Sequence, residues 1–196
     1  FYCRRDQENL CENLIFINGA YAEYICIPGQ VVRQNLLPIP DQVSFRGAAM
    51  VEPLACVLHG LEETGVQRHD SMVVIGTGPI GLMFIRMAKL RGAHVIAVGR
   101  RSNRLETARA MGADVVIDML EIPDVVAAVR AETDQGRGVD RVVEAVGLPE
   151  SWEQAIRMVR PGGTVNVLGG CPSKTIIPLD ADLLHYSEIT IKGTFH

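Results

Sequence analysis

The chain has 196 residues, of which 47% are hydrophobic and 21% are charged, and its formal net charge is −4. A mildly acidic chain without a basic run argues against a nucleic-acid partner. No apolar stretch approaches the ~20 residues needed to span a bilayer, so no membrane partner is expected. Five cysteines, an odd number, favour a cytoplasmic protein whose thiols serve as metal ligands or core residues. The chain begins with Phe1 rather than Met and lacks a signal-peptide pattern, so we expect a piece of a longer protein.

Residues 1–44 differ in character from the rest of the chain and are interpreted as the remnant of a small β-rich domain. Residues 24–27 (YICI) form a short apolar run that ends at Pro28, and this pattern predicts a strand followed by a turn. Pro38 and Pro40 predict a linker or an edge segment.

Residues 45–65 carry apolar side chains at three-to-four spacing and are predicted to form a connecting helix. Proline lacks the amide hydrogen of a regular helix and restricts the residue before it. A break or kink is therefore expected at the pair Glu52 and Pro53.

Residues 66–196 alternate apolar strands with helical segments, which favours parallel β-α-β units. Strands are expected at residues 72–75, 94–98, 115–117, 141–146, 164–168 and 189–192. Helices are expected at residues 79–90, 103–111, 123–133 and 151–159. The first strand is apolar throughout, as a strand buried on both faces requires. These elements predict an α/β fold with a doubly wound, six-stranded parallel sheet of the Rossmann type, in the order 3-2-1-4-5-6.

A glycine-rich turn follows the first strand and opens a helix. Its sequence is Gly76-Thr77-Gly78-Pro79-Ile80-Gly81. Gly76 permits the tight turn, Gly78 admits a pyrophosphate close to the backbone, and Gly81 brings helix and strand together. Pro79 and Ile80 start the helix, whose free amides face the phosphates. A plain turn that binds nothing is the alternative, and a methyl-donor domain is disfavoured because it usually ends its second strand with an acid.

The second strand ends in Gly99-Arg100-Arg101, where NAD-binding domains usually carry Asp or Glu. Glycine leaves room at this position, and arginine offers charge-assisted bonds to a 2′-phosphate. The hypothesis is a preference for NADP, although NAD stays possible. The alternative is a pair of solvated arginines at the start of a helix.

Several motifs together resemble the zinc-dependent medium-chain alcohol and polyol dehydrogenases, especially the sorbitol and threonine dehydrogenase branch. Cys3 and Cys11 are separated by seven residues, as in the second half of that family's structural zinc lobe. Residues 21–24 (YAEY), 48–60 (AAMVEPLACVLHG) and 160–163 (RPGG) match further segments of the family. The resemblance covers essentially the whole chain.

The resemblance implies zinc in the intact protein. Cys3 and Cys11 would supply half of the structural site, and Glu52 would lie beside the catalytic zinc as a ligand or as a partner of its water. The alternatives are two unliganded thiols and a helix-capping acid. The other three cysteines are expected to be core or near-core thiols: Cys26, Cys56 and Cys171.

The resemblance also implies hydride transfer between a nicotinamide and the secondary alcohol of a small alcohol or polyol. Val146 and Gly147 would lie along the cofactor, while Leu168, Gly169 and Gly170 would approach the nicotinamide. Because most of the catalytic zinc ligands would lie outside the chain, we expect the piece to be inactive alone.

The sixth strand is expected to pair with its counterpart in a second copy, which would give a homodimer or a homotetramer. Two other functions stay open. One is a zinc-free quinone or enoyl reductase of the same superfamily, and the other is a non-catalytic nucleotide-binding module. The sequence does not identify the alcohol.

Overall fold

The computed structural model describes residues 1–5 and 7–195 and divides them into two compact units. The first unit is Phe1–Val51, and the second runs from Glu52 onward. None of the described helices is both long and apolar enough to cross a membrane.

The first unit contains short helices joined by extended chain. They are two 3-10 helices, η1 (Tyr2–Arg4) and η2 (Glu8–Leu10), and two α-helices, α1 (Gly29–Asn35) and α2 (Phe45–Ala48). The predicted strand at residues 24–27 is wrong, since the described part of this unit contains no strand. A strand needs hydrogen bonds from a neighbouring strand, and this segment pairs with none in the described chain. Its Tyr24 side chain also lacks a packing partner and is 91% exposed.

Helix α3 (Val51–Thr64) begins two residues before Pro53, so the break lies at Ala49–Met50 rather than at the predicted pair. Pro53 is tolerated because it falls in the first turn, where amide hydrogens have no partner within the helix. Glu52 is therefore a residue of a regular first turn.

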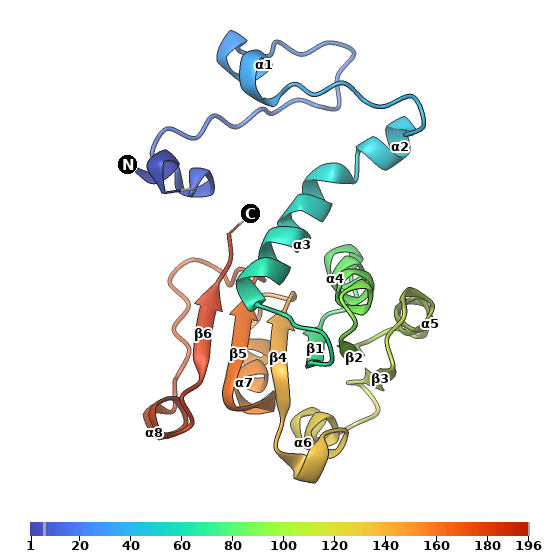
Figure 1. Cartoon of the computed structure of the whole chain (residues 1–196), viewed down its shortest axis with the longest axis vertical. Coiled ribbons are helices and arrows are strands. Elements are labelled where there is room, and N and C mark those ends of the chain that lie inside the picture. The colour runs from blue at the N-terminus through green and yellow to red at the C-terminus, as the bar shows by residue number, and fades with distance from the viewer. Residues whose placement is uncertain (6, 196) are drawn as a thin grey trace. The chain divides into compact units, whose positions relative to one another are not determined.

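The second unit is built on a six-stranded, all-parallel sheet in the order β3-β2-β1-β4-β5-β6, as predicted (Figure 1). Its strands are β1 (Ser71–Ile75), β2 (His94–Gly99), β3 (Val115–Asp118), β4 (Val139–Glu144), β5 (Val159–Val167) and β6 (Thr190–Gly193). The order reverses at β1, which pairs with β2 on one side and with β4 on the other. Ligands of such sheets bind beyond the carboxyl ends of the strands at this reversal.

Helices cover both faces of the sheet. They are α4 (Pro79–Leu90), α5 (Ser102–Met111), α6 (Val125–Ala131), α7 (Pro149–Met158) and α8 (Ala181–Tyr186), with the 3-10 helix η3 (Asp134–Gly136) before β4. Four of the five α-helices follow the predicted segments closely, whereas α8 was not predicted.

The two faces have separate apolar cores, to which alternate residues of one strand contribute. Met72 and Val74 of β1 pack with α3, α4 and α5, while Val73 and Ile75 pack with α6 and α7. This two-sided burial explains why β1 is apolar at nearly every position.

Polar side chains join β1 and β4 at their amino ends. The carboxylate of Asp140 accepts hydrogen bonds from the amide (2.8 Å) and hydroxyl (2.6 Å) of Ser71, and from Nε of Arg160 (2.7 Å). Partial burial raises the pKa of Asp140, but the bonds from Ser71 and Arg160 outweigh it and lower that pKa below its ordinary value.

Candidate functional site

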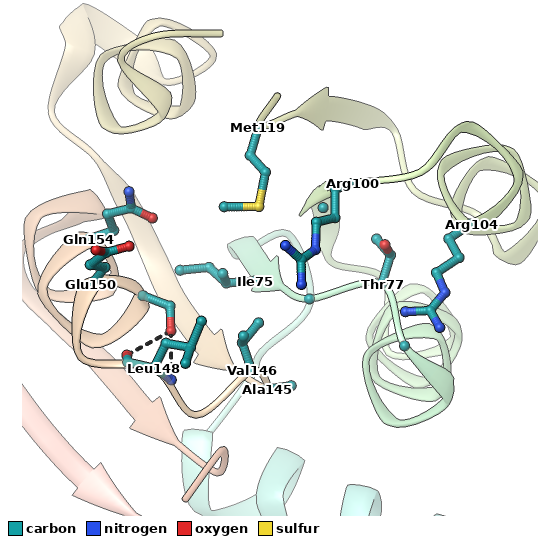
Figure 2. Close-up of a pocket in the computed structure, with 14 residues that line it drawn as sticks. Ile75, Thr77, Arg100, Arg104, Met119, Ala145, Val146, Leu148, Glu150 and Gln154 are labelled. Carbon is teal, nitrogen blue, oxygen red and sulfur yellow. Dashed lines mark hydrogen bonds between the residues drawn. The ribbon is translucent and has the colours of Figure 1, made fainter. Parts of the chain in front are cut away.

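A cavity of about 210 Å³ lies at the carboxyl ends of β1, β2 and β4, where the strand order reverses (Figure 2). Its wall combines the glycine turn, the end of β2, the residue after β3 and the start of α7. The lining residues are Ile75, Gly76, Thr77, Gly78, Gly99, Arg100, Arg104, Met119, Ala145, Val146, Leu148, Glu150, Ser151 and Gln154.

The glycine turn closes one end of the cavity. Gly76 has a φ of +106°, and its amide donates to the carbonyl oxygen of Val98 at 2.8 Å. A Cβ atom on Gly81 would lie 1.8 Å from the carbonyl oxygen of Gly76, so only glycine fits there. Gly78, by contrast, has no atom within 4 Å of a Cβ position, and this leaves open space beside the backbone.

Pro79 is the first residue of α4 and Ile80 the second, so the free amides at the start of this 12-residue helix follow the open position at Gly78. The combination of open backbone and helix start suits a phosphate group.

The end of β2 supplies positive charge. Arg100 lines the cavity, and Arg104, in the first turn of α5, lines it too. Figure 2 shows both on the side of the cavity opposite Glu150 and Gln154. Arg101 is not among the lining residues and has a φ of +76° at the cap of α5. Sequence reasoning missed Arg104, although its spacing of four residues from Arg100 was a usable signal.

Gly99 is buried, and a Cβ atom there would lie 2.3 Å from Oγ1 of Thr77. Because Gly99 has no side chain, the Thr77 side chain fits between the glycine turn and the end of β2.

Sequence reasoning also missed most of the opposite wall of the cavity. Met119 and Leu148 lie in the turns after β3 and β4, and that position was the available signal. Ser151 and Gln154 lie in the first two turns of α7.

Glu144, the last residue of β4, is fully buried. Its Oε1 accepts hydrogen bonds from the amides of Val146 (2.8 Å) and Gly147 (2.9 Å) and from the hydroxyl of Ser151 (2.7 Å). Burial raises the pKa of Glu144, and these three bonds, with a further contribution from the nearby Trp152 side chain, offset only part of that rise. An acid at the end of an apolar strand was the signal in the sequence.

The predicted nicotinamide-side residues gather where β4 and β5 end. A Cβ atom on Gly147 would lie 2.6 Å from the carbonyl oxygen of Gly170, and Nε1 of Trp152 donates to the carbonyl oxygen of Gly169 at 3.0 Å. Val146 lines the cavity, whereas Gly147, Leu168, Gly169 and Gly170 lie outside its lining.

The described residues do not assemble a zinc site. Cys3 is an exposed free thiol, and Cys11 is a partly exposed one. Glu52 is exposed, and its Oε1 accepts a bond from Sγ of Cys56 at 3.3 Å. Burial, with help from Glu52, raises the pKa of that thiol. Within the described ranges, no three His, Cys, Asp or Glu side chains cluster as metal ligands would.

The sequence profile of one family, the zinc-binding dehydrogenases, matches residues 79–196. The chain belongs to this family. It is 33% identical to D-arabitol-phosphate dehydrogenase of Enterococcus avium, covering 98% of this chain and 55% of that protein. It is 34% identical to sorbitol dehydrogenase of Bacillus subtilis (98% and 54%) and 35% identical to L-threonine 3-dehydrogenase of Pyrococcus horikoshii (98% and 55%). The chain thus spans about half the length of these curated relatives.

Solved structures of zinc-binding dehydrogenases share the fold. A zinc-binding dehydrogenase from Sinorhizobium meliloti, solved with NADP bound, superposes with a TM-score of 0.90 at 32% identity, over 98% of this chain and 57% of that one. An alcohol dehydrogenase from Thermus sp. ATN1 gives 0.86 at 35% identity, with the same coverage.

Proposed function

We propose that this chain is the nucleotide-binding part of an NADP-preferring oxidoreductase, which transfers hydride between the nicotinamide and a secondary alcohol. The observation that carries the proposal is the cavity at the sheet reversal, where an open glycine turn faces two arginines. The Sinorhizobium meliloti relative, which has the same fold, was solved with NADP.

In this proposal each part of the cavity binds one part of the nucleotide. The open backbone at Gly78 and the start of α4 hold the pyrophosphate. Apolar side chains of Met119, Val146 and Leu148 face the adenosine. Bound NADP would supply the hydride acceptor, and the chain's own residues bind and orient it.

The preference for NADP rests on charge at the end of β2. A 2′-phosphate carries negative charge, and Arg100 and Arg104 both line the cavity there. An arginine guanidinium can donate two parallel hydrogen bonds to a phosphate. No carboxylate stands at the end of β2 itself to repel the phosphate.

The substrate class is proposed from the relatives. Arabitol phosphate, sorbitol and threonine differ in charge and size, but each carries a secondary alcohol. We therefore assign the whole protein a small secondary alcohol of the polyol kind.

The proposal is tested by titrating NADPH and NADH into arginine variants. Arg100→Ala and Arg104→Ala are each expected to weaken NADPH about tenfold, because each removes a charge-assisted contact to the 2′-phosphate. Affinity for NADH, which lacks that phosphate, should stay within about twofold.

Arg101→Ala is the matched control, since Arg101 is a neighbouring exposed arginine outside the cavity lining. It is expected to leave both affinities unchanged. Equal losses for NADPH and NADH in the Arg100 and Arg104 variants would contradict the assigned preference.

A further inference from the structure

Among the buried polar side chains of the described residues, Glu144 is the only one with an ionisable group. It ends β4 beside Ile75 of β1 and Val167 of β5 in the sheet register. Its Oε2 atom is buried and has no hydrogen-bond partner among the described residues. A buried, half-paired carboxyl group costs stability, so stability alone does not explain it.

Glu144 contacts the turns that follow two neighbouring strands. Through its side chain it accepts bonds from the amides of Val146 and Gly147, which belong to the turn after β4. Through its backbone carbonyl it accepts bonds from the amides of Leu168 (3.0 Å) and Gly169 (2.9 Å), which follow β5. The side chain therefore holds the turn after β4, while the turn after β5 is bonded to the backbone.

The side-chain bonds reach the wall of the cavity. Oγ of Ser151 lies 2.7 Å from Oε1 of Glu144 and accepts a bond from the amide of Leu148 at 3.2 Å. Val146 and Leu148 line the cavity (Figure 2), and Ser151 belongs to the same lining. Moving the Glu144 carboxyl group would release three neighbouring lining residues at once.

Gly169 fits the same arrangement. A Cβ atom at this position would lie 2.6 Å from Oε2 of Glu144 and 2.4 Å from the amide nitrogen of Gly147. Glycine is thus required where the turn after β5 crosses the buried carboxyl group.

We propose that Glu144 is a positioning residue for nucleotide binding, whose carboxyl group holds the turn after β4 in the conformation that the cofactor needs. This inference rests on the proposed function. Glu144 acts through Oε1, on which its three side-chain bonds converge, and it does not touch the cofactor. An amide oxygen at the same place accepts the same three bonds.

The test compares NADPH affinity with melting temperature in the variants Glu144→Gln and Glu144→Leu. Glu144→Gln is expected to bind NADPH within about threefold of the unmodified chain, because the glutamine oxygen keeps all three bonds. Glu144→Leu is expected to bind about tenfold or more weakly, since the turn after β4 loses its acceptor. Ser151→Ala removes one of the three donors and should give a smaller loss in the same direction, even if Glu144→Leu fails to fold.

Ile189→Ala is the control for a loss of stability alone. Ile189 is 7% exposed and precedes β6, at the opposite side of the sheet from β2 and β3. This variant should lower the melting temperature and leave NADPH affinity unchanged. If lower stability alone weakened NADPH binding, Ile189→Ala would weaken it too.

Three results would overturn the inference. Unchanged NADPH affinity in Glu144→Leu would show that the turn after β4 does not depend on the carboxyl group. A loss in Glu144→Gln equal to that in Glu144→Leu would show that charge, not the converging bonds, is needed. If the unmodified chain binds neither NADPH nor NADH, the proposed function fails, and this inference fails with it.

Discussion

Two glycines of the same turn differ in what surrounds them. Gly81 packs against the backbone of Gly76, where a Cβ atom would lie at 1.8 Å, whereas Gly78 faces open space. Gly81 is therefore needed for packing of the helix on the turn. Gly78 leaves the backbone accessible, and we propose that a phosphate fills the space beside it.

Alanine at each position should separate these roles. Gly81→Ala is expected to destabilise the chain by about 2 kcal/mol or more, because backbone atoms must move. Gly78→Ala should leave the free energy of unfolding within about 0.5 kcal/mol while weakening NADPH binding about tenfold. Chemical denaturation and NADPH titration check both, and intact affinity in Gly78→Ala would contradict a phosphate at this turn.

The Asp140 carboxylate gives a prediction for pH. Its pKa is lowered in the folded chain, so its contribution to stability is fully present above the unfolded value near 3.8. That contribution is lost as the pH falls below this value and through the lowered folded pKa.

Asp140→Asn should therefore flatten the fall in stability between about pH 5 and pH 2. It should also destabilise the chain at pH 7 by about 1 kcal/mol, since the bond to Arg160 is partly exposed to solvent. Urea denaturation across this range measures the effect. A variant whose pH profile matches that of the unmodified chain would show that Asp140 does not contribute.

At the scale of elements, most of the second unit could be predicted because its strands are apolar and its helices begin and end at clear signals. Pro79 starts α4, and Gly112 ends α5 in a left-handed conformation. Helix α8 could not be predicted, since six residues are too few for a periodic pattern. Its N-cap is Asp180, whose side chain accepts bonds from the amides of Asp182 and Leu183.

The candidate site was predicted only in part, because only some of its residues form a local pattern in the sequence. The glycine turn is a local pattern, so sequence order alone reveals it. The opposite wall comes from chain segments that the sheet brings together, and Gln154 lies 77 residues after Thr77. The strand predicted at residues 24–27 failed because strand pairing depends on a partner that a local pattern does not specify.

Strand β6 carries the prediction for assembly. It lies at the end of the sheet order beside β5, so its outer edge has no strand partner within the described chain. Such an edge can pair with another chain. We predict a homodimer or a homotetramer, with a mass two or four times the 21.4 kDa of one chain. Sedimentation equilibrium measures this mass directly, and a monomer at all concentrations would contradict pairing through β6.

At the scale of the whole molecule, all residues that line the cavity lie between positions 75 and 154, within the second compact unit. The second unit therefore supplies every residue that lines the cavity. Family membership and the fold of an NADP-bound relative agree with this placement. The alcohol substrate and the hydride transfer remain proposals, because the chain spans about half the length of the curated relatives it matches.

The most direct measurement is a titration of the unmodified chain with NADPH and with NADH, followed by nicotinamide fluorescence. Our account predicts that NADPH binds at least about tenfold more tightly, a difference of about 1.4 kcal/mol. Equal affinities would leave the nucleotide cavity in place but contradict the roles of Arg100 and Arg104. Absence of binding by either nucleotide would show that this cavity is not a dinucleotide site.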